Sequence, residues 1–397
     1  MALMPVAEAL TRILATAKLS AAETVKLENS YDRILANDLK AKRDQPPFPS
    51  SAMDGYALRH ADIAAPLKLI GVSAAGHAFK GTVKAGEAVR ILTGAPLPKG
   101  ADTIVIQENT KIEGSTLFIT EPTSLGKNIR VQGLDFKRGD VLVPAGTKLN
   151  ARDIGLAAAG NAETLRVRRK PRLVLFTTGD ELVLPGQKPR ADQIVSSNSH
   201  ALSAMANAWG AKVINLGIIG DTLKATMAAI KKAEGADILI TTGGASVGDH
   251  DYVQEALRKS GVKIDFWKIA LRPGKPLMFG TKGKLRVLGL PGNPVSALVC
   301  ARIFLRPLLN AIQGNADGQT SATAKLGSAL PANDNRQDYL RATLEYAADG
   351  SRIATSFSKQ DSSMQRTLRN ADCLVIREPH APEAPAGTLI SVVMLDF

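Results

Sequence analysis

The chain has 397 residues, 45% of them hydrophobic, so it is long enough for two to four domains with substantial cores. The formal net charge of +13 favours small anionic partners. The basic residues are dispersed, and the densest run, Arg166–Arg172, contains no aromatic residues, so we expect no nucleic-acid binding. The sequence contains no run of about 18 apolar residues, so we expect no membrane span. Two distant cysteines, Cys300 and Cys373, favour a reducing, cytoplasmic location.

The first 170 residues predict a connector that is interrupted by a separate β-rich unit. Apolar spacing predicts helices over 5–18 and 21–36. Over residues 44–143 the sequence pattern changes and predicts short strands separated by glycine and proline, such as Val89–Leu92 and Thr103–Ile106. A helical pattern returns at Asp153–Gly160. We therefore expect an inserted β-rich domain (44–143) between the two parts, 1–43 and 144–170, of one helical connector.

Residues 171–318 alternate between apolar strands and amphipathic helices, which is typical of a doubly wound α/β domain. Asp221 is a candidate N-cap for a helix over 222–233, and Asn293 with Pro294 is a candidate start for a helix that ends at Leu309. The other predicted helices are Ser199–Trp209 and Asp251–Lys259. The predicted strands are Arg172–Thr178, Lys212–Leu216, Ile238–Thr242, Lys263–Trp267 and Leu285–Leu290.

The last part of the chain, residues 319–397, is polar at first and then strand-like. The clearest strands are Tyr339–Tyr346, Cys373–Arg377 and Thr388–Leu395. Short strands with turn residues between them predict a small β domain that resembles a barrel. The fold class is therefore α/β plus β, in several domains.

Carboxylates follow the predicted parallel strands where each strand ends. Glu181 follows the first strand, Asp221 the second, and Asp249 and Asp251 the third. The carboxyl ends of parallel strands share one edge of a sheet, so these side chains should converge on one crevice. Oxygen ligands of this kind favour Mg²⁺, with Glu181, Asp221, Asp249 and Asp251 as candidate ligands. The simpler alternative is that Asp221 and Asp251 only cap helices.

The same loops carry groups that suit an anion. Gly243, Gly244 and Ser246 follow the third strand, and glycine lets backbone N–H groups approach a phosphate closely. Pro291, Asn293 and Ser296 surround a predicted helix N-terminus, which attracts anions. Lys268, Arg272 and Lys275 are three cations within eight residues. The simpler interpretation of these three cations is a solvated basic loop. We favour phosphate or oxyanion binding because this loop connects two strands of the same sheet.

Six strings along the chain resemble the molybdopterin molybdenumtransferase family, which includes MoeA and the gephyrin E domain. They occur in the family's order and spacing, and the resemblance extends from about residue 5 to 395. The Gly-Gly/Asp and Pro-Gly-Asn-Pro strings also occur in related molybdopterin-binding domains. The string that begins Pro-Pro-Phe and the terminal β domain distinguish this family from those domains. The strings are PPFPSSAMDGYA (46–57), ILTGAPLP (91–98), TTGDEL (177–182), TTGGASVGDHDY (241–252), RPGKP (272–276) and LPGNPVSA (290–297).

The resemblance implies an enzyme that inserts molybdate into adenylylated molybdopterin, uses Mg²⁺ and releases AMP. It implies a homodimer in which the inserted domain of one subunit completes the site of the other, and a transient contact with the adenylylating enzyme. It identifies the α/β unit as the molybdopterin-binding domain. The residues with implied catalytic roles are Asp54, Thr93, Glu181, Asp221, Asp251 and Lys268; Asp135, Arg341, Ser362 and Ser363 are implied to bind substrate.

The sequence departs from the family pattern at a few positions, and other functions stay open. Arg272 stands where many members have lysine, and Leu134 where many have glutamate. One alternative is a gephyrin-like scaffold that binds proteins without turnover. Another is an enzyme that acts on a different pterin or nucleotide phosphate. We expect the molybdenumtransferase activity, because the carboxylates and cations of the crevice are all present.

Overall fold

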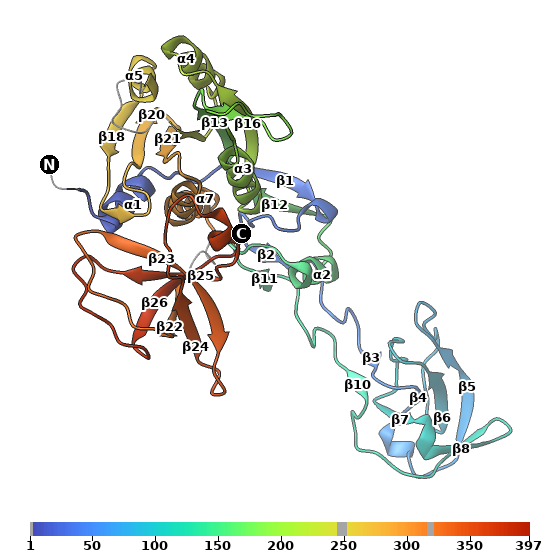
Figure 1. The fold of residues 1–397 in the computed structure, drawn as a ribbon. Helices are drawn as coiled ribbons and strands as arrows, with labels where there is room; N and C mark the ends of the chain where they lie inside the picture. The colour runs from blue at the N-terminus through green and yellow to red at the C-terminus, as the bar shows by residue number, and fades with distance from the viewer. Residues whose placement is uncertain (1–2, 244–251, 316–320) are drawn as a thin grey trace.

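The computed structural model describes residues 3–243, 252–315 and 321–397. Figure 1 shows a main body, formed by an α/β sheet and a C-terminal barrel, and a separate β-sheet that two chain segments hold away from it. The chain leaves the main body and returns to it through the ribbon of β3 (Ser50–Ser51) and β10 (Ile129–Arg130). The multidomain α/β plus β class expected from the sequence is therefore confirmed.

The α/β sheet has six strands in the order β16-β13-β17-β21-β20-β18. The pairings β13–β16, β13–β17 and β17–β21 are parallel, whereas β20 runs antiparallel to both of its neighbours. Consequently β18 runs in the same direction as β21, and its carboxyl end lies at the same edge. The bounds are β13 (Arg172–Thr178), β16 (Lys212–Ile219), β17 (Ile238–Thr242), β18 (Lys263–Trp267), β20 (Met278–Lys282) and β21 (Leu285–Leu290).

Helices cover both faces of this sheet. On one face, Leu173 and Leu175 of β13 pack in a core with α1, α3, α6 and α7, and on the other face Val174 and Phe176 pack with α4 and α5. Alternate residues of the strand are thus buried on opposite sides, which explains its nearly continuous apolar sequence. The helices are α1 (Val6–Ala15), α3 (Asn198–Ala208), α4 (Leu223–Lys232), α5 (Tyr252–Lys259), α6 (Pro294–Cys300) and α7 (Arg306–Gln313).

A π-helical turn over Ala301–Leu305 joins α6 and α7 into one long helix. By length and hydropathy the segment Pro294–Gln313 could cross a membrane, but 78% of its most apolar 18-residue stretch is buried inside the protein. Its side chains form the centre of the larger core, with Val299, Phe304 and Leu308 fully buried. Its apolar character is therefore explained by burial within the fold.

The α/β unit agrees closely with the sequence predictions, with three differences. The bounds of β13, β17, β18 and β21 coincide with those predicted, but β16 ends at Ile219 instead of Leu216, and β20 was not predicted. The expected cap of α4 was wrong: the N-cap is Thr222, whose hydroxyl accepts a hydrogen bond from the N–H of Ala225 at 3.2 Å. Asp221 is thereby left outside the helix.

The connector contains much less helix than expected. Residues 21–36 were predicted to be helical, but they form β1 (Ala22–Lys26) and a 3₁₀ turn η1 (Leu27–Asn29), followed by irregular chain. β1 pairs antiparallel with β12 (Thr164–Arg168), and this distant partner overrides the local helical spacing. The predicted helix near residue 153 is confirmed as α2 (Ala151–Ala159), which begins with a capping box at Asn150. A second ribbon pairs β2 (Leu39–Lys40) with β11 (Val141–Val143).

The inserted sheet has six strands in the order β7-β4-β6-β5-β9-β8. β4 is fully buried because β6 and β7 flank it, and Gly55 packs so closely on β7 that a Cβ there would lie 2.1 Å from the Val105 carbonyl oxygen. Two short turns, η2 (His60–Asp62) and η3 (Gln107–Asn109), complete this unit. The strands are β4 (Gly55–Leu58), β5 (Leu67–Ser73), β6 (Glu87–Ile91), β7 (Thr103–Ile106), β8 (Thr110–Glu113) and β9 (Thr116–Ile119).

The C-terminal strands close into a barrel. The order is β23-β24-β22-β26-β25, and β25 pairs back onto β23, so the described strands leave no free edge within this ring. The short strand β19 (Leu271–Arg272) from the α/β unit adds to β23 in parallel. The bounds are β22 (Ser321–Leu326), β23 (Gln337–Tyr346), β24 (Arg352–Ser356), β25 (Cys373–Arg377) and β26 (Leu389–Met394), with helix α8 (Gln365–Arg369) between β24 and β25.

Candidate functional site

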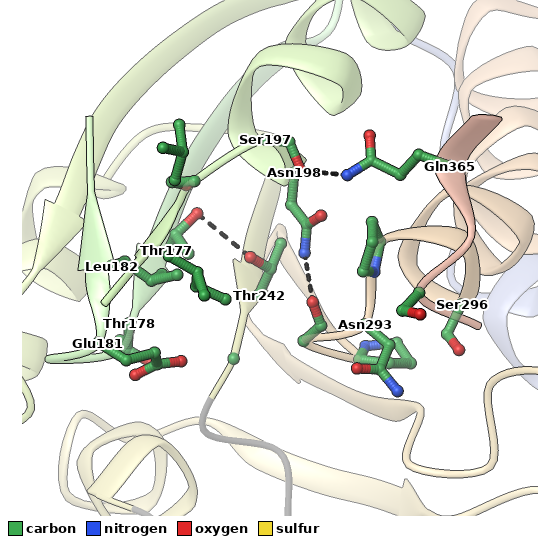
Figure 2. Close-up of a pocket in the computed structure, with 18 of the residues that line it drawn as sticks. Thr177, Thr178, Glu181, Leu182, Ser197, Asn198, Thr242, Asn293, Ser296 and Gln365 are labelled. Atoms are coloured by element: carbon green, nitrogen blue, oxygen red, sulfur yellow. Dashed lines mark hydrogen bonds between the residues drawn. The ribbon is translucent and has the colours of Figure 1, made fainter. Parts of the chain in front are cut away.

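A pocket of about 610 Å³ lies at the carboxyl ends of β13, β17 and β21. β13 stands between β16 and β17, so the order of the strands reverses beside it, which is where open α/β sheets bind ligands. Figure 2 shows that side chains from the sheet and from the starts of α3, α6 and α8 surround it. The lining includes Thr177, Thr178, Glu181, Ser196, Ser197, Asn198, Thr242, Gly243, Pro276, Pro291, Gly292, Asn293, Pro294, Ser296, Ser363 and Gln365.

Two buried hydroxyl groups line the pocket without a partner among the residues that the structure describes. The hydroxyls of Thr178 and Ser196 make no hydrogen bond within those residues, and both residues are only 2–3% exposed. Thr242 instead donates to the hydroxyl of Thr177 at 3.2 Å. A buried polar group normally has a partner, so the two unpaired hydroxyls suit a polar ligand or ordered water.

Glycine permits a close approach between two loops at the floor of the pocket. Gly243 has φ +81°, and a Cβ there would lie 2.2 Å from the carbonyl oxygen of Thr178. A Cβ on Gly292 would be 3.7 Å from the Cα of Gly243, so the loops after β17 and β21 are also neighbours. Gly243 therefore lies where the sequence placed it, in the pocket. Gly244, Ser246, Asp249 and Asp251 lie outside the described residues.

Hydrogen bonds tie three elements together around the pocket. Asn198 at the start of α3 donates to the Gly292 carbonyl at 2.6 Å. Asn293 begins α6 and donates through its amide to the Ser362 hydroxyl at 2.8 Å, while the Ser362 carbonyl accepts from the N–H of Val295 at 3.0 Å. One N–H of the α6 terminus is thus already satisfied by the protein. Gln365 completes the set by donating to the Ser197 hydroxyl at 2.8 Å.

The described carboxylates come from two adjacent loops. Glu181 lines the pocket. The Asp221 carboxylate accepts from the N–H of Asp180 at 3.2 Å, and the Asp180 carboxylate accepts from the N–H of Asp221 at 3.3 Å. The loops after β13 and β16 therefore converge as expected. Within the described ranges, no three His, Cys, Asp or Glu side chains are grouped to hold a metal; two of the four expected ligands lie outside those ranges.

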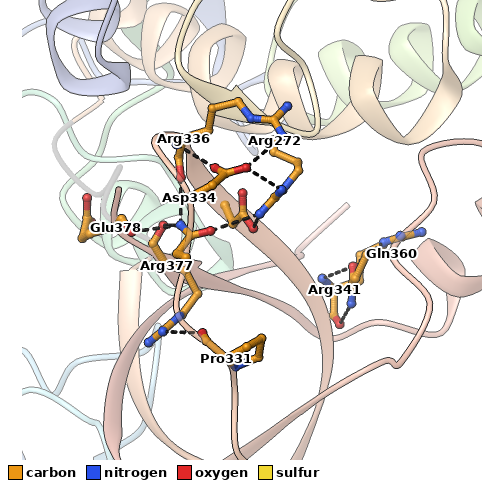
Figure 3. A network of polar contacts seen from close by, with 10 residues as sticks. Arg272, Pro331, Asp334, Arg336, Arg341, Gln360, Arg377 and Glu378 are labelled. Atoms are coloured by element: carbon orange, nitrogen blue, oxygen red, sulfur yellow. Dashed lines mark hydrogen bonds and ion pairs between the residues drawn. The ribbon is translucent and has the colours of Figure 1, made fainter. Parts of the chain in front are cut away.

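The three expected cations have different surroundings. Lys268 has φ +75°, and its ammonium lies 4.1 Å from the centre of the Trp267 ring. Lys275 is exposed beside Pro276 at the pocket, and its ammonium has no hydrogen bond or ion pair to any residue that the structure describes. Arg272 faces the barrel instead, where it pairs with Asp334 at 2.9 Å and with Asp338 (Figure 3). The structure thus does not bring Arg272 to the pocket.

The substrate-binding residues expected in the C-terminal domain also lie in different places. Ser363 lines the pocket, and its hydroxyl donates to Asp361 at 2.5 Å. Arg341 is 1% exposed inside the barrel, where it donates to the Gln360 side chain at 3.1 Å and to the Met364 carbonyl at 3.2 Å. Burial lowers the pKa of Arg341. Arg341 therefore supports the segment that carries Ser362 and Ser363, and it does not line the pocket itself.

Asp54, Thr93 and Asp135 belong to the inserted unit and its connecting chain. Figure 1 shows this unit well away from the α/β sheet of the same chain. Asp54 accepts from both the N–H and the hydroxyl of Thr93, each at 2.7 Å, and these bonds lower the pKa of Asp54, the backbone bond most. The backbone N–H of Asp135 donates to Gln45 at 2.9 Å. Within one chain these residues do not meet the pocket.

Replacing Thr93 by valine is expected to raise the pKa of Asp54 towards its ordinary value, because the hydroxyl donor is lost while the N–H donor stays. A depressed carboxyl pKa stabilises the folded state above the unfolded-state pKa, and that stabilisation disappears as the pH falls through the folded-state pKa. Carboxyl carbon NMR titration measures the change. Thr120→Val, at an exposed threonine of the same unit, is the control; an unshifted Asp54 in Thr93→Val would contradict the role of the hydroxyl.

Sequence reasoning missed several residues that line the pocket. Thr177 and Thr178 end β13, and polar residues at the carboxyl end of a buried strand could have indicated them. Ser196 and Asn198 precede and begin α3, where polar residues are common as caps. Gln365 had no local signal, because it reaches the pocket only through the packing of the α8 segment on α6.

Known protein families match most of the chain. Residues 4–160 match the "MoeA N-terminal region (domain I and II)", residues 174–311 the "Probable molybdopterin binding domain", and residues 323–395 the "MoeA C-terminal region (domain IV)". A molybdopterin molybdenumtransferase of Nostoc sp. is 38% identical over 341 residues, which cover 83% of this chain and 78% of that protein. One from Haemophilus influenzae is 33% identical over 380 residues, 93% of each chain.

The fold comparison agrees with the sequence comparison. The crystal structure of a molybdopterin biosynthesis MoeA protein from Pyrococcus horikosii superimposes with a TM-score of 0.87 at 29% identity, and it covers 99% of both chains. Family models, relatives and fold thus lead to the same assignment. The chain belongs to the MoeA family of molybdopterin molybdenumtransferases and is a transferase with a role in molybdenum cofactor biosynthesis.

Proposed function

We propose that this protein inserts molybdenum from molybdate into adenylylated molybdopterin, in a Mg²⁺-dependent reaction that releases AMP. The observation that carries the proposal is the pocket at the strand-order reversal. Buried hydroxyls with no partner in the described part of the chain, the α6 N-terminus and Glu181 surround this one cavity. A phosphoanhydride and an oxyanion both need hydrogen-bond donors and cations around them. Lys275, next to Pro276 of the pocket lining, supplies a cation that has no partner within the described ranges, with Lys268 on the same loop.

The acidic residues at the strand ends suit a divalent cation. Glu181 and Asp221 offer hard oxygen ligands from adjacent loops, and Asp249 and Asp251 of the next loop would complete the set. A bound Mg²⁺ would neutralise charge on the phosphate groups. The protein's own part is to orient the pyrophosphate against Thr178, Ser196 and the backbone around Gly243, and to place the molybdate between Lys275 and Ser363. These groups come from the sheet and from the barrel segment, so both units contribute.

We further propose a cytoplasmic homodimer with the domain limits expected from the sequence: 1–43 with 144–170, 44–143, 171–318 and 319–397. Asp54, Thr93 and Asp135 are remote from the pocket of their own chain, which supports a role in the pocket of a partner subunit (Figure 1). Such an arrangement leaves each pocket open until a second chain is present. Transient contact with the adenylylating enzyme would deliver the substrate.

The direct test is AMP release from adenylylated molybdopterin in the presence of molybdate and Mg²⁺. Glu181→Gln and Asp251→Asn are expected to lower turnover by at least about 100-fold, because each removes a carboxylate that orients or polarises the reacting groups. Glu234→Gln is the matched control, since Glu234 is exposed in the loop that leads into β17 at the opposite edge of the sheet.

Three outcomes would contradict the proposal. Unchanged turnover in Glu181→Gln and Asp251→Asn would remove these carboxylates from the site. Absence of AMP release by the unmodified protein, together with tight binding of a protein partner, would favour the scaffold alternative. Release of a different nucleotide product from another pterin or nucleotide phosphate would favour the second alternative.

A further inference from the structure

The loop of residues 268–276, which together with Leu277 links β18 to β20, connects the pocket to the barrel. Its two ends are held together, because Lys268 N–H donates to the Leu277 carbonyl and Ile269 N–H to the Lys275 carbonyl, both at 3.0 Å. Pro276 at one end lines the pocket. The middle of the loop, β19, pairs with the barrel strand β23 in the register Leu271↔Gln337 and Arg272↔Asp338. Movement of the barrel edge would therefore move this loop.

The Arg272 side chain strengthens that connection with three contacts. Its guanidinium donates to Asp334 at 2.9 Å, to the Asn333 side chain at 3.0 Å and to Asp338 (Figure 3). The two carboxylates are not equivalent: the Asp334 side chain is 44% exposed, whereas that of Asp338 is 6% exposed. A half-exposed pair contributes little, but a buried carboxylate depends on its partner.

The backbone of Asp338 belongs to the barrel strand β23, and its carboxylate has Arg272 as its hydrogen-bond partner among the described residues. One carboxylate oxygen is buried without a hydrogen bond to any residue that the structure describes, and the other accepts one from the guanidinium. Burial raises the pKa of Asp338, while the hydrogen bond from Arg272 opposes that rise. Arg272 and Asp338 both line a second cavity of about 620 Å³ on the barrel, and neither lines the pocket at the sheet. A planar guanidinium can contact several acceptors at once, which a lysine ammonium at this position could not do in the same geometry.

We propose that Asp338 is a positioning residue: through Arg272 it holds the 268–276 loop against the barrel and so places Lys275 and Pro276 at the pocket. The inference rests on the proposed function for its kinetic consequences. Arg272 then serves the reaction without contacting the substrate, and the anion-binding cation of this loop is Lys275. Asp334 contributes only a minor, exposed part of the same contact.

The test compares the Michaelis constant for molybdate with the turnover number in Asp338→Asn. Asparagine has the same shape and removes the buried charge, so we expect the thermal unfolding midpoint to stay within a few degrees. The KM for molybdate should rise roughly tenfold with a smaller change in kcat, because a displaced Lys275 binds the anion less well. Asp334→Asn is the matched control and should change KM less than about twofold.

A double-mutant cycle tests whether the effect passes through Arg272. Asp338→Asn should raise KM much less in an Arg272→Met background than in the unmodified chain, because two residues that act through one contact are not additive. A fall in KM in Asp338→Asn would overturn the proposal, since it would mean that Asp338 keeps Arg272 away from the anion. An unchanged KM would overturn it as well.

A measurement independent of turnover separates this proposal from the proposed function. Trp267 precedes Lys268 and contacts its ammonium, so its fluorescence reports on the loop in a Trp209→Phe background that leaves one tryptophan. Asp338→Asn should make Trp267 roughly twofold easier to quench with acrylamide, and Asp334→Asn should not. Equal quenching would refute the positioning role even if AMP release is absent. If Asp338→Asn does not fold, Arg272→Lys takes its place and is expected to show the same KM and quenching changes.

Discussion

Replacing Gly243 by alanine is expected to lower the free energy of unfolding by about 2–4 kcal/mol and to abolish substrate binding in the pocket. Two physical causes add. A non-glycine residue is strained at the φ of +81° found here, and the new Cβ would lie 2.2 Å from the Thr178 carbonyl oxygen, so backbone must move. The displaced segments are the ends of β13 and β17, which form the floor of the pocket. Denaturant unfolding and a fluorescence titration with molybdopterin measure the two effects.

Gly235→Ala is the matched control for this prediction. Gly235 has nearly the same φ, +78°, but nothing lies within 4 Å of the position that a Cβ would take, and it is at the opposite edge of the sheet. Gly235→Ala should therefore lower the free energy of unfolding by only about 1–2 kcal/mol, from backbone strain, and leave substrate binding intact. Equal losses of stability in the two variants would show that the contact with Thr178 has no effect. Intact binding in Gly243→Ala would separate this glycine from the site.

Replacing Arg341 by alanine is expected to destabilise the protein by about 2–4 kcal/mol, because a large buried side chain leaves a cavity and its partners lose their donors. Arg341 is among the largest side chains with less than 2% exposure. It donates to Gln360 and to the Met364 carbonyl, on either side of Ser362 and Ser363. The loss should therefore spread to the pocket and reduce molybdate affinity. Denaturant unfolding and the KM for molybdate provide the measurements.

The control for Arg341→Ala is Arg352→Ala on the adjacent strand β24. Arg352 is exposed, so its truncation should change the free energy of unfolding by less than about 0.5 kcal/mol. The family resemblance implies that Arg341 contacts molybdate directly. Direct contact alone would raise KM without loss of stability, so a fully stable Arg341→Ala with weak molybdate binding would contradict the buried, supporting role.

Local sequence patterns predicted the α/β unit well because its strands are buried on both faces. Residues 172–178 and 238–242 are continuous apolar runs bounded by turn residues, and the observed β13 and β17 coincide with them. Patterns failed at 21–36, where Val25 fits a helical spacing but lies in β1 and pairs with β12, a strand about 140 residues away. The short strand β20 was missed because the sequence between Lys275 and Leu285 contains glycine and charged residues that weaken the signal.

For individual site residues, the sequence predicted some positions in the pocket and missed others. Glu181, Gly243, Asn293 and Ser296 line the pocket as expected, because a residue at the end of a parallel strand has only one edge to occupy. Arg272 lies in the same basic loop as Lys275, yet it turns to the barrel. The acceptors that attract it, Asp334 and Asp338, are more than 60 residues later in the chain. No local pattern contains that information.

The sequence by itself determined the family, the order of the domains and the edge of the sheet where polar residues collect. These follow from strings and periodicities that act over a few residues, where backbone conformation and burial are set locally. The tertiary structure decided which polar side chains reach the pocket, that β1 is a strand, and that Arg272 and Arg341 support the site from the barrel. Those outcomes depend on contacts between segments distant in sequence, and a charged side chain takes the partners that packing brings to it.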